Sequence, residues 1–335
     1  MPYWLCLLAA LLAFAIAALT GFALIPYLKK LHFGQTILES GPKWHKSKQG
    51  TPIMGGFMFI LGSVIATVTG YTVYRFYFTD LTNDALGNNA LRLLAVGGYA
   101  LLCSSIGFAD DYIKAVKKQN LGLNAKQKLA LQFLFSILFI AALYKLGDND
   151  ATVHLVFADV YLGIFYYPLM VVVMVFITNA VNLTDGVDGL CATVTVVTML
   201  ALSVLAGMMK EYELDIYAIS IAGGCIGFLL WNLNPAKCFM GDTGSMYLGG
   251  AFVALSFALQ NHLLMLMIGV VYICEALSVV LQVISFKTTG KRIFKMSPIH
   301  HHFEMSGFSE YKIVITFSLF NLLFAAGAIA IYVYA

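Results

Sequence analysis

The sequence predicts an all-α, polytopic integral membrane protein with about ten transmembrane helices. Of the 335 residues, 60% are hydrophobic and only 11% are charged, and the mean hydropathy is +0.84. A soluble domain rarely buries so much apolar surface, whereas a set of membrane spans requires it. The six cysteines are scattered, mostly within apolar runs, and their spacing predicts neither a disulfide framework nor a zinc site.

Ten apolar runs define the expected elements, each near the length of about 20 residues that a spanning helix needs. The first has no basic segment before it, so we expect a retained span rather than a cleaved signal. No soluble domain, low-complexity tract or repeat interrupts the pattern, so residues 1–335 are expected to form a single transmembrane domain. The runs are 4–28, 54–74, 91–109, 128–146, 162–181, 187–208, 215–231, 243–260, 264–286 and 312–334.

The basic residues predict the orientation of these spans. Sixteen of the 20 lysines and arginines lie in the loops after the first, third, seventh and ninth runs. The positive-inside rule places those loops in the cytoplasm and both termini on the extracytoplasmic side. The acidic and histidine motifs fall on the same cytoplasmic side, while the acidic residues of the outer loops are spread without pattern. We therefore expect an active site on the cytoplasmic face, the lipid bilayer as a partner, and no nucleic-acid partner.

The stretch between the fifth and sixth runs carries Asn182, Asp185 and Asp188, each three residues after the last. On a helix this spacing places all three side chains on one broad face. Carboxylates at the rim of a bilayer are unfavourable unless a cation, a lysine or a substrate interacts with them.

Three further carboxylates end or begin spans on the same side. Asp110 and Asp111 close the third run, where adjacent like charges repel unless a magnesium ion or a cation such as Lys114 compensates them. The alternative is a salt-bridged helix end that faces water. Asp242 precedes the eighth run, where it suits either a helix N-cap or a single carboxylate ligand of magnesium.

Two loops carry groups that suit phosphate. The first cytoplasmic loop, 41–56, has Lys48 and ends in a glycine pair that opens a helix, although basic anchoring at the membrane explains it equally well. His300, His301 and His302 cannot share one face of a helix, and in an extended segment His301 would point away from the other two. No cysteine or carboxylate cluster completes a zinc site there, so hydrogen bonding to phosphate is favoured.

Glu275 and Gln282 lie inside the ninth run, seven residues apart, and so share a helix face. Either they line a cavity or they contact a neighbouring helix.

Carboxylates, lysines and histidines at one membrane face, with no redox motif, indicate magnesium-assisted phosphoryl or pyrophosphate chemistry. Five stretches carry a more specific resemblance, which runs nearly end to end: Asp110-Asp111 with Lys114, NLTDGVD at 182–188, MGDTGS at 240–245, GTPIMGG at 50–56 and PIHHHFE at 298–304. Together they resemble the bacterial phospho-N-acetylmuramoyl-pentapeptide transferases, within the polyprenyl-phosphate N-acetylhexosamine-1-phosphate transferase superfamily. One position departs, since that family usually has Thr where this chain has Ile53.

The resemblance implies a reaction of cell-wall synthesis in the bacterial inner membrane. Undecaprenyl phosphate attacks UDP-MurNAc-pentapeptide, giving lipid I and UMP, with Mg2+ as cofactor. Asp242 would bind the metal, Asp111 would be a base or a partner of the lipid phosphate, and Asp185 and Asp188 would shape the nucleotide and metal site. The full implied set is, as catalytic groups, Asp110, Asp111, Asp185, Asp188, Asp242 and His300, and, as substrate-binding groups, Lys48, Lys114, Lys128, Asn182, Asn232, Phe239, His301 and His302.

Two rival functions and two open properties, the reaction route and the oligomeric state, remain at this point. A sister enzyme that transfers GlcNAc-1-phosphate is disfavoured by the histidine run, and a transporter by the gathering of ionisable groups at one face. Direct attack by the lipid phosphate is the hypothesis over an aspartyl-phosphate intermediate. A homodimer is compatible with the sequence, because the pairs Gly97-Gly98 and Gly223-Gly224 suit packing either between copies or within the chain.

Overall fold

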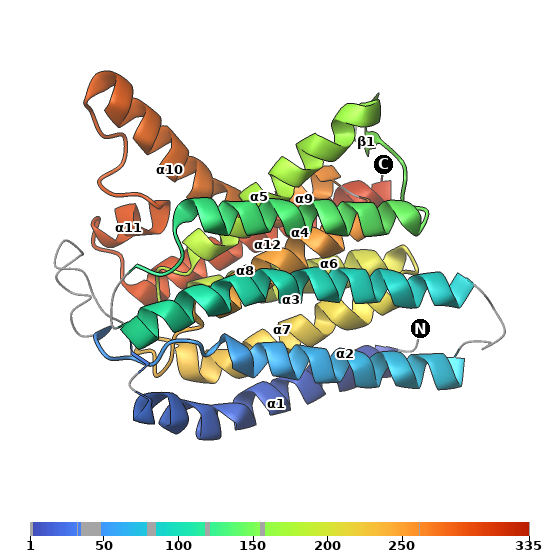
Figure 1. Ribbon diagram of the computed structural model, residues 1–335, viewed down its shortest axis with the longest axis horizontal. Coiled ribbons are helices and arrows are strands. Elements are labelled where there is room, and N and C mark those ends of the chain that lie inside the picture. The colour runs from blue at the N-terminus through green and yellow to red at the C-terminus, as the bar shows by residue number, and fades with distance from the viewer. Residues whose placement is uncertain are drawn as a thin grey trace.

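The computed structural model describes residues 3–31, 33–34, 48–78, 85–117, 121–154, 158–260 and 262–334. Long helices run side by side in a bundle (Figure 1). The helices are α1 (Tyr3–Lys30), α2 (Gly56–Phe78), α3 (Ala85–Lys117), α4 (Ala125–Lys145), α5 (Tyr166–Thr184), α6 (Leu190–Met208), α7 (Tyr212–Asn232), α8 (Gly241–Ala258), α9 (His262–Ile268), α10 (Val270–Thr289), α11 (Ile299–Glu304) and α12 (Glu310–Tyr334). A short antiparallel hairpin, β1 (Thr152–His154) with β2 (Asp159–Tyr161), and the 3-10 turn η2 (Gly163–Phe165) precede α5.

The all-α membrane architecture is confirmed. Within the described ranges, nine helices are long and apolar enough to cross a membrane, and they match nine of the ten predicted runs. The remaining run is α8, whose first turn is polar. Every residue of α8 from Thr243 to Ala258 is buried. A helix enclosed by protein has no lipid-facing surface, so it does not need the hydrophobicity of the outer spans.

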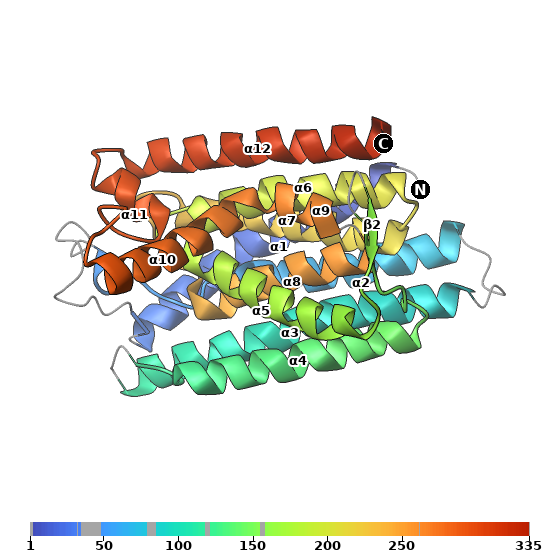
Figure 2. The same ribbon diagram turned by 90° about the horizontal axis from the view of Figure 1, so that it is seen from above.

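Helix α8 is the core of the bundle. It packs against α3 and α5 and also contacts α2 and α6, and Figure 2 shows it in the interior of the bundle. Gly107 of α3 permits the closest approach, because a Cβ atom there would lie 2.1 Å from the carbonyl oxygen of Asp242. The polar first turn of α8 is therefore held directly against the end of α3.

Three local predictions were wrong. The predicted helical face through Asp185 and Asp188 does not form, because α5 ends at Thr184 and α6 begins only at Leu190. The ninth run is two helices, α9 and α10, that meet at Gly269, where the Phe252 ring fills the space of a Cβ atom. The three histidines lie on the short helix α11 rather than in an extended segment.

The first turn of α1 and the last turn of α12 lie at the same end of the bundle (Figure 2). At that end Arg92 pairs with Asp148 at 3.0 Å and with Glu211 at 2.9 Å. The outer acidic residues are thus not without pattern, because two of them converge on one guanidinium that ties α3 to the loops after α4 and α6. The candidate site lies at the opposite end.

Candidate functional site

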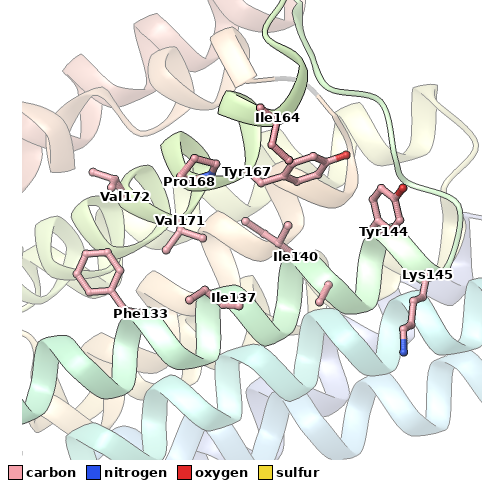
Figure 3. Close-up of a pocket in the computed structure, with 11 residues that line it drawn as sticks. Phe133, Ile137, Ile140, Tyr144, Lys145, Ile164, Tyr167, Pro168, Val171 and Val172 are labelled. Carbon is pink, nitrogen blue, oxygen red and sulfur yellow. The ribbon is translucent and has the colours of Figure 1, made fainter.

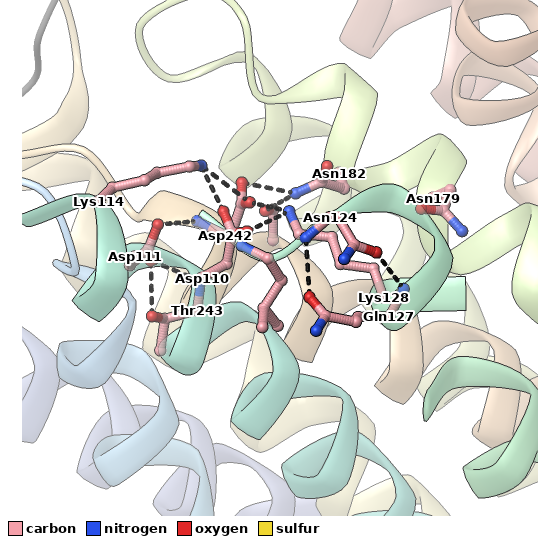
Figure 4. A network of polar contacts seen from close by, with 12 residues as sticks. Asp110, Asp111, Lys114, Asn124, Gln127, Lys128, Asn179, Asn182, Asp242 and Thr243 are labelled. Atoms are coloured by element: carbon pink, nitrogen blue, oxygen red, sulfur yellow. Dashed lines mark hydrogen bonds and ion pairs between the residues drawn. The ribbon is translucent and has the colours of Figure 1, made fainter. Parts of the chain in front are cut away.

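Three carboxylates meet where α3 ends and α8 begins. Asp110 and Asp111 come from α3 and Asp242 from the first turn of α8, and one oxygen from each lies within 4.8 Å of the others. Asp110 is 1% and Asp111 2% exposed, while the Asp242 side chain retains 21%. We call these three residues the carboxylate cluster (Figure 4). They do not form the water-facing helix end that was the alternative interpretation of Asp110 and Asp111.

Asp111 binds the N-terminus of α8. Its carboxylate accepts hydrogen bonds from the backbone N–H of Asp242 at 3.2 Å, the N–H of Thr243 at 2.9 Å and the Thr243 hydroxyl at 2.7 Å. The first N–H groups of a helix lack partners within it, and their dipole favours an anion. The N-cap residue of α8, Met240, makes no side-chain cap. Asp111 therefore replaces the cap, and Asp242 is not the N-cap that sequence reasoning allowed.

Two lysines share the cluster. Lys114, one helical turn after Asp110, lies 2.5 Å from that carboxylate and 3.2 Å from Asp242. Lys128 lies 3.0 Å from Asp110 and 2.8 Å from Asp242. The prediction that Lys114 pairs with a carboxylate of the Asp110–Asp111 pair is confirmed by its contact with Asp110.

The sequence fixes the place of Lys128 through a capping box. The side-chain oxygens of Asn124 and Gln127 each accept a hydrogen bond from the other residue's backbone N–H, so α4 begins about one turn before Lys128. Such a box satisfies two N–H groups that a helix start would otherwise leave bare.

Asn182 joins α5 to the cluster. Its amide donates to Asp242 at 3.1 Å and to Ser245 at 2.8 Å. Asp185 follows at the end of the helix, and its carboxylate has no hydrogen-bond partner among the described residues. Burial, together with the charges of Asp242, Asp111 and Asp188, raises the pKa of Asp185 to about 8.

Asp188 lies in a second set of contacts. One oxygen accepts from Lys48 Nζ at 2.6 Å, and the other accepts from Asn234 at 3.1 Å and from the N–H of Ala236 at 3.0 Å. Burial alone would lower the pKa of Lys48, but hydrogen bonds to Asp188 and Glu310 raise it.

Glu310 was missed by sequence reasoning. It accepts from Lys48 at 2.8 Å and from the Asp188 N–H at 2.9 Å. The available signal was a lone acidic residue at the start of the last span, which ordinary helix capping explains equally well.

Asn232 and Phe239 support the site through its backbone. Asn232 is 2% exposed, accepts from the Gly189 N–H at 3.1 Å and donates to the Cys238 carbonyl at 3.0 Å. The Phe239 carbonyl accepts from the Gly55 N–H at 2.8 Å. The glycine pair that opens α2 is thus bonded to segment 239–240, and its N–H groups are not free for phosphate. Residues 41–47 of that loop lie outside the described residues.

The three histidines have three different partners. His300 is fully buried and its Nδ1 lies 3.0 Å from Glu275. His301 contacts Glu304 of the same helix at 2.5 Å, and His302 accepts from the Lys295 N–H at 3.2 Å. Gln282 binds the backbone of Ile293 and Phe294. Glu275 therefore contacts α11, and Gln282 contacts the segment that leads to it. Of the two predicted alternatives, this arrangement agrees with contact to a neighbouring helix rather than with the lining of a cavity.

The carboxylate cluster suits a hard divalent cation. All its donors are oxygen, which favours magnesium over the softer metals. When ionised, three carboxylates against two ammonium groups leave one net negative charge, before Asp185 is counted. A single exposed carboxylate, as at Asp242, matches an ion that keeps most of its waters and shares phosphate oxygens.

A separate groove of about 740 Å³ lies between α4 and α5. Its lining is mostly apolar, with Ile137, Ile140 and Val171 facing across it and Lys145 at one end (Figure 3). None of its lining residues belongs to the carboxylate cluster. The groove therefore matches hydrocarbon better than the charged groups of a nucleotide.

Known proteins resemble this chain over nearly its whole length. A family model described as glycosyl transferase family 4 matches residues 93–260. A phospho-N-acetylmuramoyl-pentapeptide-transferase of Halalkalibacterium halodurans is 44% identical over 324 residues, covering 96% of both chains. Proteins of the same name are 43% identical in Bacillus subtilis, over 98% of both chains, and 42% identical in Caldicellulosiruptor bescii, over 97% of this chain and 96% of that one.

Proposed function

Because the chain belongs to the phospho-N-acetylmuramoyl-pentapeptide transferases, we propose that it transfers phospho-MurNAc-pentapeptide from UDP-MurNAc-pentapeptide to undecaprenyl phosphate. The products are lipid I and UMP. The observation that supports this chemistry best is the meeting of Asp110, Asp111 and Asp242 with Lys114 and Lys128 at one end of a membrane bundle. That site offers a cation position and two phosphate partners within reach of a lipid substrate.

The residues divide the work by their contacts. Asp242, the most exposed member of the cluster, would hold Mg2+, which would supply positive charge to the diphosphate. Lys114 and Lys128 exchange their carboxylate partners for phosphate oxygens when substrate binds. Asp111 acts by positioning, since three donors from the first turn of α8 already surround its carboxylate.

The nucleotide end is assigned to the second set of contacts. Lys48, between Asp188 and Glu310, is the cation there, and its 16% exposure leaves it open to an anionic ligand. Asn182 orients Asp242, while Asn232 and Phe239 hold the loops around that ligand. His301 and His302 are the more exposed histidines and are the ones assigned to phosphate.

In the direct route an oxygen of undecaprenyl phosphate attacks the β-phosphorus of the nucleotide. The bond from that phosphorus to the bridging oxygen breaks, and UMP leaves with the electron pair. A phosphate monoester is largely ionised near neutral pH, so no strong base is required. The competing route forms an aspartyl phosphate first. Incubation with UDP-MurNAc-pentapeptide alone distinguishes them, because UMP release with a phosphorylated enzyme and no lipid would refute direct attack.

Orientation and assembly complete the proposal. We place the cluster on the cytoplasmic face of the bacterial inner membrane and both termini on the other side, which is the orientation that the distribution of basic residues predicts. A homodimer remains a proposal: Gly223 packs within the chain against Ala10, while a Cβ atom at Gly97 or Gly98 would meet nothing. Small residues with open space are compatible with a partner helix or with lipid.

An exchange assay tests the substrate. Labelled UMP should enter UDP-MurNAc-pentapeptide in the presence of undecaprenyl phosphate and magnesium, and should not enter UDP-GlcNAc. Label entering only UDP-GlcNAc would establish the sister activity instead. The assay is run in detergent, where there is no second compartment, so turnover also excludes a pure transporter.

A further inference from the structure

A buried carboxylate–imidazole pair lies behind the candidate site. Glu275 of α10 and His300 of α11 are both 0% exposed, and His300 Nδ1 lies 3.0 Å from Glu275 Oε2. The backbone N–H of His300 points at the same oxygen at 3.4 Å. Ionisable groups buried inside a membrane protein are unfavourable unless they serve a purpose. The transfer chemistry described above gives Glu275 no role.

The pair fixes the orientation of the imidazole. Nδ1 contacts the carboxylate, and the centroid of the His301 ring lies 4.2 Å from that of His300. Nε2 is therefore the one ring nitrogen of His300 that can contact another group. Nε2 is buried and has no hydrogen-bond partner among the described residues. A carboxylate on one ring nitrogen sets the tautomer and the direction of the other.

Nε2 faces the turn that carries Asp185 and Asp188. A Cβ atom on Gly186, the residue after Asp185, would lie 2.2 Å from Nε2, closer than any side chain permits. The ring therefore rests directly against the backbone of this turn. The Asp185 carboxylate has no hydrogen-bond partner among the described residues, so the position of this side chain depends on the backbone of the turn.

We propose that Glu275 is a positioning residue for the transfer reaction, which acts through His300. It holds the imidazole so that the ring supports Gly186 and Nε2 points at the 185–188 turn. Glu275 itself is fully buried and does not touch substrate. The inference rests on the proposed function, because its consequence is measured as transfer.

Five purified variants test the inference: Glu275→Ala, Glu275→Gln, His300→Ala, the double variant Glu275→Ala with His300→Ala, and Ser278→Ala. The last is the matched control. Ser278 is buried on the same helix, one turn after Glu275, and its hydroxyl donates only to the Glu275 carbonyl.

Glu275→Ala should lower kcat at least about tenfold, as loss of a group that orients a histidine does, while KM for UDP-MurNAc-pentapeptide changes little. Glu275→Gln should recover part of kcat, because its amide oxygen still accepts from Nδ1. The double variant should be no slower than His300→Ala, since residues that act as a unit are not additive. Ser278→Ala should behave as wild type.

Gly186 gives an independent arm if Glu275→Ala does not fold. Gly186→Ala places a methyl group against the ring, so it should lower kcat in the parent protein and have little effect once His300 is Ala.

Additive losses in both cycles, or a Glu275 effect confined to the melting temperature, would overturn the inference. Transfer by wild type and Ser278→Ala separates the two hypotheses. If neither releases UMP, the proposed function fails, whereas transfer by both with additive cycles refutes only the role of Glu275.

Discussion

Replacement of Asp111 by Asn should destabilise the protein much more than the same change at Asp242. Asp111 is 2% exposed and accepts two backbone N–H groups and one hydroxyl. Asn retains one acceptor oxygen and turns an NH2 group toward N–H donors that cannot rotate away. A hydrogen bond to a charged group contributes about 1.5–3 kcal/mol, and an unsatisfied buried donor costs a similar amount.

The loss of one charged hydrogen bond and the one buried donor left unsatisfied together predict a destabilisation of about 3–6 kcal/mol for Asp111→Asn. The assay is unfolding in detergent by added SDS, with the melting temperature as a second readout. Asp242→Asn is the matched control, because its partners Lys114, Lys128 and Asn182 are all partly exposed and can bind water instead. If Asp111→Asn unfolds like wild type, then Asp111 does not hold the N-terminus of α8.

Three further outcomes are expected. Asp242→Asn should abolish magnesium-dependent UMP release while it melts as wild type does, and normal turnover would remove Asp242 from the metal site. The raised pKa of Asp185 means that the folded state holds a proton that the unfolded state releases. Without magnesium, the free energy of unfolding should therefore fall as pH rises from the usual pKa of 3.8 toward about 8. Magnesium should reduce this pH dependence, and the same pH dependence in Asp185→Asn as in wild type would contradict the assignment. Glu310→Gln should lower KM for the nucleotide substrate, by less than about fivefold because a partly exposed ion pair contributes at most about 1 kcal/mol. Lys48→Met should raise the same KM. An unchanged KM in both variants would remove Lys48 from the substrate site.

The spans were predictable because lipid imposes a simple rule on sequence. A helix that faces hydrocarbon must be apolar where it crosses the membrane, so nine runs were recognisable, although α3 extends eight residues beyond the end of its run at residue 109. Helix α8 escapes that rule, since protein surrounds it. Its run was found nonetheless, because the interior of a bundle is also apolar.

The local errors share one physical cause. At 182–188 the three-residue spacing indicated a helical face, but Gly186 must pass close to the His300 ring and Gly189 has a φ of 79°. The first constraint comes from a segment distant in sequence, and the second is a local backbone conformation that ends the helical pattern. The three histidines became helical for the same kind of reason, because the backbone N–H of His300 contacts Glu275, 25 residues earlier.

The candidate site was predictable by residue type but not by partner. Charged side chains at a membrane face are rare enough to be noticed singly. Which lysine meets which carboxylate depends on how α3, α4 and α8 pack, and sequence spacing gives this only within one helix, as for Lys114 with Asp110. The role of Asp111 at the start of α8 and the contact of Glu310 with Lys48 join residues more than 100 positions apart.

Because protein encloses α8, the position of the candidate site should depend little on the thickness of the bilayer. Thinning or thickening of the membrane changes the tilt of the helices that contact lipid. Asp242 stands on a helix whose residues from Thr243 to Ala258 are all buried, and Gly107 holds its first turn against α3. The position of this carboxylate is therefore buffered against changes in acyl-chain length, which the peripheral spans absorb.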